Sequence, residues 1–120
     1  MASYQVDRGA WGRYTIFEQM GNIGSEVGRA IKAHRSGNDK RRQGAMDRAF
    51  DLFDATVECL ADRQSPRLRE VLLAREEFAR LFSDGAFDED ADALERYFAS
   101  FAIAARKGTS EDHDREEQRE

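Results

Sequence analysis

The sequence predicts an all-α protein built as one four-helix bundle, and three observations lead to this class. Apolar residues recur at three- and four-residue steps in four successive segments. Strand-like alternation never persists beyond a few residues, and turn-forming residues separate the four segments at 36–39, 65–66 and 84–85. Because such short connections favour neighbours that run antiparallel, we expect an up-down-up-down bundle.

Length and composition narrow the class of protein further. The 120 residues suffice for one hydrophobic core, and the net charge of −5 argues against general affinity for DNA, RNA or an anionic membrane. The single cysteine, Cys59, excludes an intrachain disulfide. No apolar stretch approaches the length of a membrane span. We therefore expect a soluble, cytoplasmic protein without a cofactor.

The first predicted helix covers residues 11–35 and follows a flexible lead-in at 1–10. Its apolar stripe consists of Ile16, Phe17, Met20, Ile23, Val27 and Ile31. Gly21, Gly24 and Gly28 lie along one flank of this stripe. A glycine inside a helix costs about 0.5–1 kcal/mol relative to alanine. Three of them predict the close approach of a neighbouring helix, a second chain or a ligand, with Ser25 beside them.

The second predicted helix covers 40–61, after a turn in which Gly37 suits a left-handed conformation and Asn38 or Asp39 caps the helix. Its apolar face consists of Met46, Ala49, Phe50, Phe53, Val57 and Leu60. An acidic stripe lies beside that face and consists of Asp47, Asp51, Asp54 and Glu58. The basic cluster 40–42 is a possible partner for an acidic surface in this chain or in another.

The last two helices are predicted over 66–83 and 88–107. Ser65 and Pro66 are a typical helix start, and the acids at 88–92 favour another. The third helix is predicted to bury Leu68, Val71, Leu72, Phe78, Ala79 and Phe82. The fourth is predicted to direct Leu94, Tyr97, Phe98, Phe101 and Ala105 inward. Residues 108–120 are almost entirely polar and charged, which predicts a disordered tail.

Arg75 is a candidate binding residue because it falls near the middle of an apolar stripe. Its guanidinium must either reach solvent along the stem of the side chain or be paired, since an isolated buried charge is very costly. Glu26, Asp54 and Glu58 are the possible partners. One hypothesis places Arg75 and Glu26 in a polar pocket that binds a small ligand.

Arg29 and His34 form a pair with four residues between them. This spacing resembles the arginine–histidine motif of HEPN ribonucleases, which are also small helical bundles. The resemblance implies phosphodiester cleavage, with His34 as acid or base and Arg29 on the phosphate. A HEPN-like ribonuclease or toxin–antitoxin component is therefore an alternative. Five helical steps, however, separate the two side chains by about 140° around the axis.

Other chemistry finds little support in the sequence. The acidic stripe lacks the Glu-x-x-His motif of di-metal bundles, so no metal site is predicted. Segments at 17–32, 48–54 and 67–70, with 75–76, resemble small uncharacterised prokaryotic helical-bundle proteins. That resemblance implies a fold and assigns no functional residue.

The function predicted from sequence is that of a non-enzymatic protein-interaction module that self-associates as a homodimer. The binding residues predicted for it are Gly21, Gly24, Ser25, Glu26, Gly28 and Arg75. The partner is a protein or a second copy of the chain.

Overall fold

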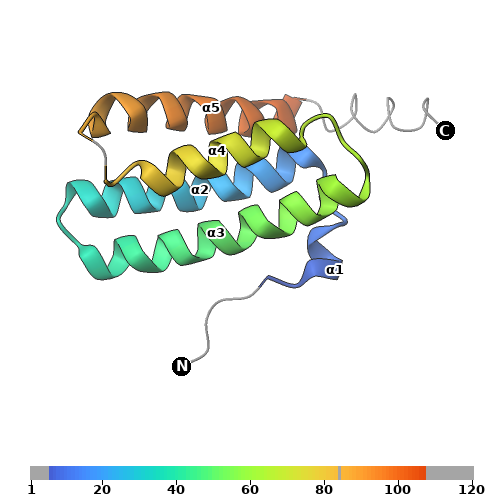
Figure 1. Ribbon diagram of the computed structural model, residues 1–120, viewed down its shortest axis with the longest axis horizontal. Coiled ribbons are helices and arrows are strands. Elements are labelled where there is room, and N and C mark those ends of the chain that lie inside the picture. Colours follow the sequence, from blue (N-terminus) through green and yellow to red (C-terminus); the bar gives the residue numbers. More distant parts are fainter. Residues whose placement is uncertain (1–5, 84, 108–120) are drawn as a thin grey trace.

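A computed structural model describes residues 6–83 and 85–107 of the chain. The described residues form five helices and no strands (Figure 1), which confirms the all-helical class. The helices are α1 (Arg8–Trp11), α2 (Ile16–Arg35), α3 (Asp39–Asp62), α4 (Leu68–Arg80) and α5 (Phe87–Lys107). The predicted tail at 108–120 and the first half of the predicted lead-in lie outside the described residues.

The predicted helix over 11–35 is wrong at its start, because the chain breaks between Trp11 and Ile16. Trp11 ends the short helix α1, and its indole N–H donates to Thr56 Oγ1 on α3 at 2.9 Å. Thr15 then caps α2 through a capping box, in which Thr15 and Glu18 each accept the other's backbone N–H. The Thr-x-x-Glu pattern is the sequence signal for this break.

The other boundaries lie close to those predicted. Asn38 caps α3 by accepting the Arg41 backbone N–H at 3.0 Å, and Gly37 has the expected left-handed conformation, with φ of +72°. The helix α4 begins at Leu68, two residues after Pro66. Ser65 still caps the turn there, since its Oγ accepts the Arg67 backbone N–H at 3.2 Å.

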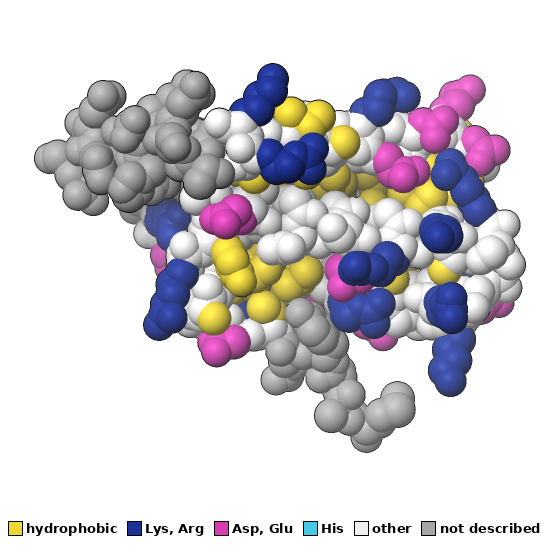
Figure 2. Space-filling model, turned by 180° about the vertical axis from the view of Figure 1, so that it is seen from behind, with side chains coloured by type: hydrophobic (Ala, Val, Ile, Leu, Met, Phe, Trp, Pro, Cys, Tyr) yellow, Lys and Arg dark blue, Asp and Glu magenta, His cyan; other side chains and the backbone are white. Residues whose placement is uncertain are grey.

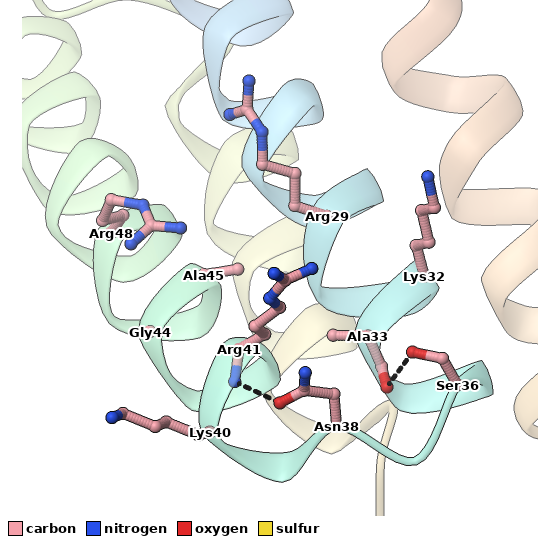
Figure 3. A pocket seen from close by; sticks show the side chains of 10 residues that line it. All are labelled: Arg29, Lys32, Ala33, Ser36, Asn38, Lys40, Arg41, Gly44, Ala45 and Arg48. Atoms are coloured by element: carbon pink, nitrogen blue, oxygen red, sulfur yellow. Dashed lines mark hydrogen bonds between the residues drawn. The ribbon is translucent and has the colours of Figure 1, made fainter.

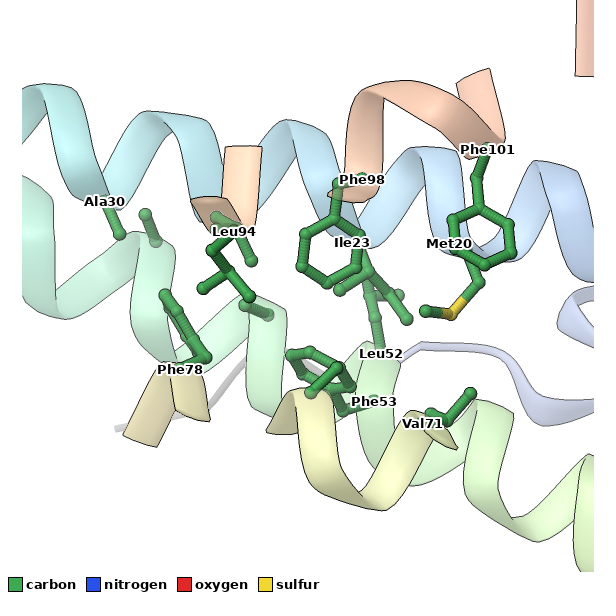
Figure 4. Packing of buried hydrophobic residues seen from close by; sticks show 14 of the residues in the cluster. Met20, Ile23, Ala30, Leu52, Phe53, Val71, Phe78, Leu94, Phe98 and Phe101 are labelled. Atoms are coloured by element: carbon green, nitrogen blue, oxygen red, sulfur yellow. The ribbon is translucent and has the colours of Figure 1, made fainter. Parts of the chain in front are cut away.

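The core is organised around α2, which packs against both α3 and α5, while α4 packs on α3. Figure 4 shows Phe53 of α3 reaching between α4 and α5. Its ring centroid lies 6.2 Å from that of Phe78 on α4 and 5.9 Å from that of Phe98 on α5. The largest fully buried side chains are Phe53, Phe78, Met20, Ile23, Ile31, Gln19, Val27, Val71 and Thr56.

The predicted buried face of α4 needs correction at two residues. Leu72 is 44% exposed and Ala79 is also exposed, whereas Ala74 and Leu81 are buried. The buried residues of this segment follow steps of three and four from Val71, so they form one narrow stripe against α3. Leu72 lies about 100° from Val71 around the helix axis and therefore faces away.

Among the described helices, none combines the length and the apolarity that crossing a membrane requires.

Candidate functional site

The glycine flank of α2 lies along the seam with α5. A Cβ atom added at Gly24 would lie 2.6 Å from Phe98 Cβ, so α5 occupies the space that this glycine leaves. At Gly21 the nearest neighbour is Ala102, at an ordinary 3.8 Å. A Cβ at Gly28 would meet nothing within 4 Å. Packing within the chain therefore explains Gly24 and leaves Gly28 without a structural reason.

Arg75 and Glu26 do not share a contact in the structure. Arg75 donates from Nε to Asp54 Oδ1 at 2.9 Å, and its guanidinium lies 5.0 Å from the centre of the Phe50 ring. Of the partners predicted for Arg75, the structure selects Asp54. Glu26 Oε2 instead accepts a hydrogen bond from Arg48 Nε of α3 at 3.1 Å. The small-ligand pocket around Arg75 and Glu26 stays a prediction without a shared contact to support it.

His34 and Arg29 have different surroundings. The His34 ring packs against both Phe82 and Phe87, with centroid distances of 5.0 and 4.4 Å, and its Nδ1 lies 3.0 Å from Arg42 Nη1. This bond makes Nδ1 the acceptor, because a guanidinium can only donate. Arg29 is exposed and lies in a groove between α2 and α3. The ribonuclease hypothesis stays a prediction, and His34 is not among the residues that line the groove containing Arg29.

That groove combines a large volume with a lining rich in cations. It has a volume of about 730 Å³ and lies where the end of α2 meets the start of α3 (Figure 3). Its lining residues are Arg29, Lys32, Ala33, Ser36, Asn38, Lys40, Arg41, Gly44, Ala45 and Arg48. Five of these ten residues are cationic, and none carries a carboxylate.

The groove carries uncompensated positive charge. Lys32, Lys40 and Arg41 form no ion pair within the described part of the chain. The other two cations share Glu26: Arg48 through the hydrogen bond above, and Arg29 through Nη1 at 3.2 Å from Oε1. Two arginines thus share the single negative charge of Glu26. The groove therefore has a surplus of positive charge in a chain whose net charge is −5.

Local structure produces this concentration of charge. The tight turn after α2 brings the last turns of one helix beside the first turns of the next, so cations spaced along both helices meet. In Figure 3 the guanidinium groups of Arg41 and Arg48 point toward the space between the helices. Gly44 and Ala45 are small and leave that space open. The start of α3 adds the positive end of a helix dipole, which favours anions.

Sequence reasoning found this site only in part. The predicted basic cluster 40–42 contributes Lys40 and Arg41, whereas Arg42 turns away to His34 and Asp39. Arg29 and Arg48 were not expected to join it. The signal for them is the predicted turn at 36–39, because a helical hairpin places both strips of cations side by side.

The acidic stripe of α3 forms ion pairs with residues of two other helices. Asp51 and Glu58 bind Arg8 of α1 at 3.1 and 3.0 Å, and Asp54 binds Arg75 of α4. Within the described ranges no three acidic, histidine or cysteine side chains gather as a metal site would require.

Fold and groove together define an all-helical protein with a cationic groove on its surface. Comparison with protein-family models, with curated proteins and with solved structures gives no match. The predicted resemblance to small prokaryotic helical proteins thus stays a prediction.

Proposed function

We propose that this chain is a non-enzymatic protein-interaction module, built as an up-down-up-down bundle of its four longer helices, whose groove between α2 and α3 receives an acidic segment of a partner protein. The observation that carries this proposal is the lining of the groove, with five cations and no carboxylate. Three of those cations have no partner among the described residues. A carboxylate-rich segment would supply the missing charge.

The dimensions of the groove suit such a ligand. Its volume of about 730 Å³ falls within the range of about 300–1,000 Å³ that is typical of ligand sites. It is open to solvent along one side, so its charges act at a high effective dielectric. Each contact with a carboxylate is then worth little alone, and several are needed. We expect affinity to fall with added salt, because the Debye length shortens to about 8 Å at 0.15 M.

An acidic protein segment fits the groove better than a nucleic acid does. No aromatic side chain lines the groove, so it offers no platform on which bases could stack. Carboxylates need only charge and hydrogen-bond donors, and arginine presents these in a planar fork.

Titration of a fluorescent oligoglutamate peptide, followed by anisotropy, tests the proposal. We expect saturable binding at low salt and roughly tenfold or more weaker binding to the Lys32→Glu/Arg41→Glu variant, because each substitution replaces an attraction with a repulsion. Arg13→Glu/Arg69→Glu is the matched control. It makes the same change in net charge at exposed residues outside the groove.

Equal loss of binding in both variants would mean that the overall charge of the chain governs binding, and the groove would not be the site. Absence of binding at low salt would also overturn the proposal. Tighter binding of a single-stranded oligonucleotide than of oligoglutamate would replace the protein partner with a nucleic acid.

A further inference from the structure

One face of the molecule carries opposite charges side by side. Figure 2 shows acidic side chains gathered over the N-terminal end of α5 and basic side chains over the adjacent ends of α2 and α3. The acidic residues Asp88, Asp92 and Glu95 follow one another at steps of four and three, which places them on one side of α5. We refer to these three residues as the acidic strip.

The acidic strip lies along the edge of α2 that is opposite to the groove. Arg35 of α2 binds Asp92 at 3.3 Å and Glu95 at 3.5 Å. Glu95 also lines a shallow depression on the α2–α5 seam. The cations Arg29 and Lys32 belong to the other edge of α2, where it meets α3. The exposed side of α2 therefore separates a positive surface from a negative one at the same end of the bundle.

This arrangement is self-complementary. In a dimer with two-fold symmetry, a contact between one surface of the first copy and a different surface of the second copy occurs twice, with the roles of the copies exchanged. A two-fold axis through the exposed side of α2 would bring the groove of each copy onto the acidic strip of the other. A face of one sign would instead repel its own copy.

We infer that the partner of the groove is a second copy of this chain, with the acidic strip of each copy seated against the groove of the other. This inference rests on the proposed function, since it names the acidic surface that the groove receives. The pairing supplies carboxylates to Lys32 and Arg41, which have none within the described chain. An added Cβ at Gly28 would meet nothing within 4 Å. Because Gly28 has no side chain, the second copy can approach the surface of α2 closely there.

A charge-swap experiment tests this pairing directly. The molar mass of the full chain is measured by light scattering over a concentration series, at ionic strengths of about 0.05 and 0.5 M. We expect a dimer at low salt that dissociates at high salt. The groove variant Lys32→Glu/Arg41→Glu and the strip variant Asp88→Lys/Asp92→Lys should each raise the dissociation constant roughly tenfold or more.

An equal mixture of the two variants should form a dimer again at low salt. In the mixed dimer the acidic groove of one variant faces the basic strip of the other at one contact, and a wild-type groove faces a wild-type strip at the second contact. Restoration is therefore specific to the proposed pairing. Circular dichroism checks that each variant is folded, and Glu95→Lys replaces Asp88→Lys if lysine in the first turn of α5 destabilises that helix.

Three results would overturn the inference. They are a monomer at every concentration, a dimer that survives both variants, and two monomeric variants whose mixture stays monomeric. The control Arg13→Glu/Arg69→Glu should dimerise as the wild type does. If the wild type is monomeric but binds oligoglutamate through the groove, the proposed function stands and only the identity of its partner is wrong.

Discussion

Within the described part of the chain, Tyr97 of α5 makes the shortest hydrogen bond between side chains of different helices. Its hydroxyl donates to Glu70 Oε1 of α4 at 2.7 Å. Burial and this bond to a carboxylate raise the pKa of Tyr97 well above its usual value of 10.0. The folded state therefore holds the phenolic proton more tightly than the unfolded chain does.

The stability of the fold should consequently depend on pH in the alkaline range. A raised pKa in the folded state stabilises the protein fully below about pH 10, the ordinary value of tyrosine, and this contribution is lost as the pH rises further. We expect the free energy of unfolding of the wild type to fall relative to that of Tyr97→Phe above about pH 10. Urea unfolding of both proteins from neutral to alkaline pH measures the difference. Parallel curves would show that Tyr97 does not contribute.

At the scale of the elements, close packing of α5 on α2 depends on Gly24. An alanine there would place its Cβ 2.6 Å from Phe98 Cβ, a distance that real structures do not tolerate without a shift of the helix. At Gly28 the same change meets open space. Of these two glycines, which lie one turn apart on one helix, only Gly24 is required by the packing of α5.

The matched pair Gly24→Ala and Gly28→Ala tests this difference between the two glycines. We expect Gly24→Ala to destabilise the fold by about 1–3 kcal/mol through overpacking. Gly28→Ala should stabilise it by about 0.5–1 kcal/mol, because alanine restricts the unfolded chain and favours the helix. Chemical denaturation of the monomeric protein at high salt measures both. A stable Gly24→Ala protein would mean that α5 moves away at little cost.

At the scale of the whole molecule, Phe53 connects three helices. It is fully buried on α3 and its ring meets Phe78 of α4 and Phe98 of α5. The helices α4 and α5 meet each other far less extensively than each meets the α2–α3 pair. One aromatic side chain therefore does much to hold the two outer helices on the same core.

Replacement of Phe53 should destabilise the molecule as a unit. We expect Phe53→Ala to cost about 3–5 kcal/mol, a large part of the stability of a small domain. Ile103→Ala is the control, since Ile103 is 45% exposed and its loss should change stability by about 0.5 kcal/mol or less. Denaturation followed by circular dichroism and by tryptophan fluorescence measures both variants. Selective loss of one helix in Phe53→Ala would show that the core is not cooperative.

The sequence by itself determined the helical class, the turn at 36–39 and most residues of the core. These follow from the spacing of apolar residues and from the chemistry of capping and turn residues, which act over a few neighbours along the chain. The same local rules would also have placed the break before Ile16, since Thr15 and Glu18 carry a capping box. The prediction that Leu72 is buried is wrong, because a wide stripe of apolar residues does not reveal which of them face the neighbouring helix.

Only the tertiary structure decided which charges meet. Asp54 was one of three possible partners of Arg75, and Arg48 lies 22 residues from the Glu26 that it binds. The groove likewise joins cations from two helices, and its charge is uncompensated because no carboxylate residue lines it. Periodicity along one helix determines which side chains share a face. Which surface that face meets depends on how the helices pack, and in this protein packing determines the site.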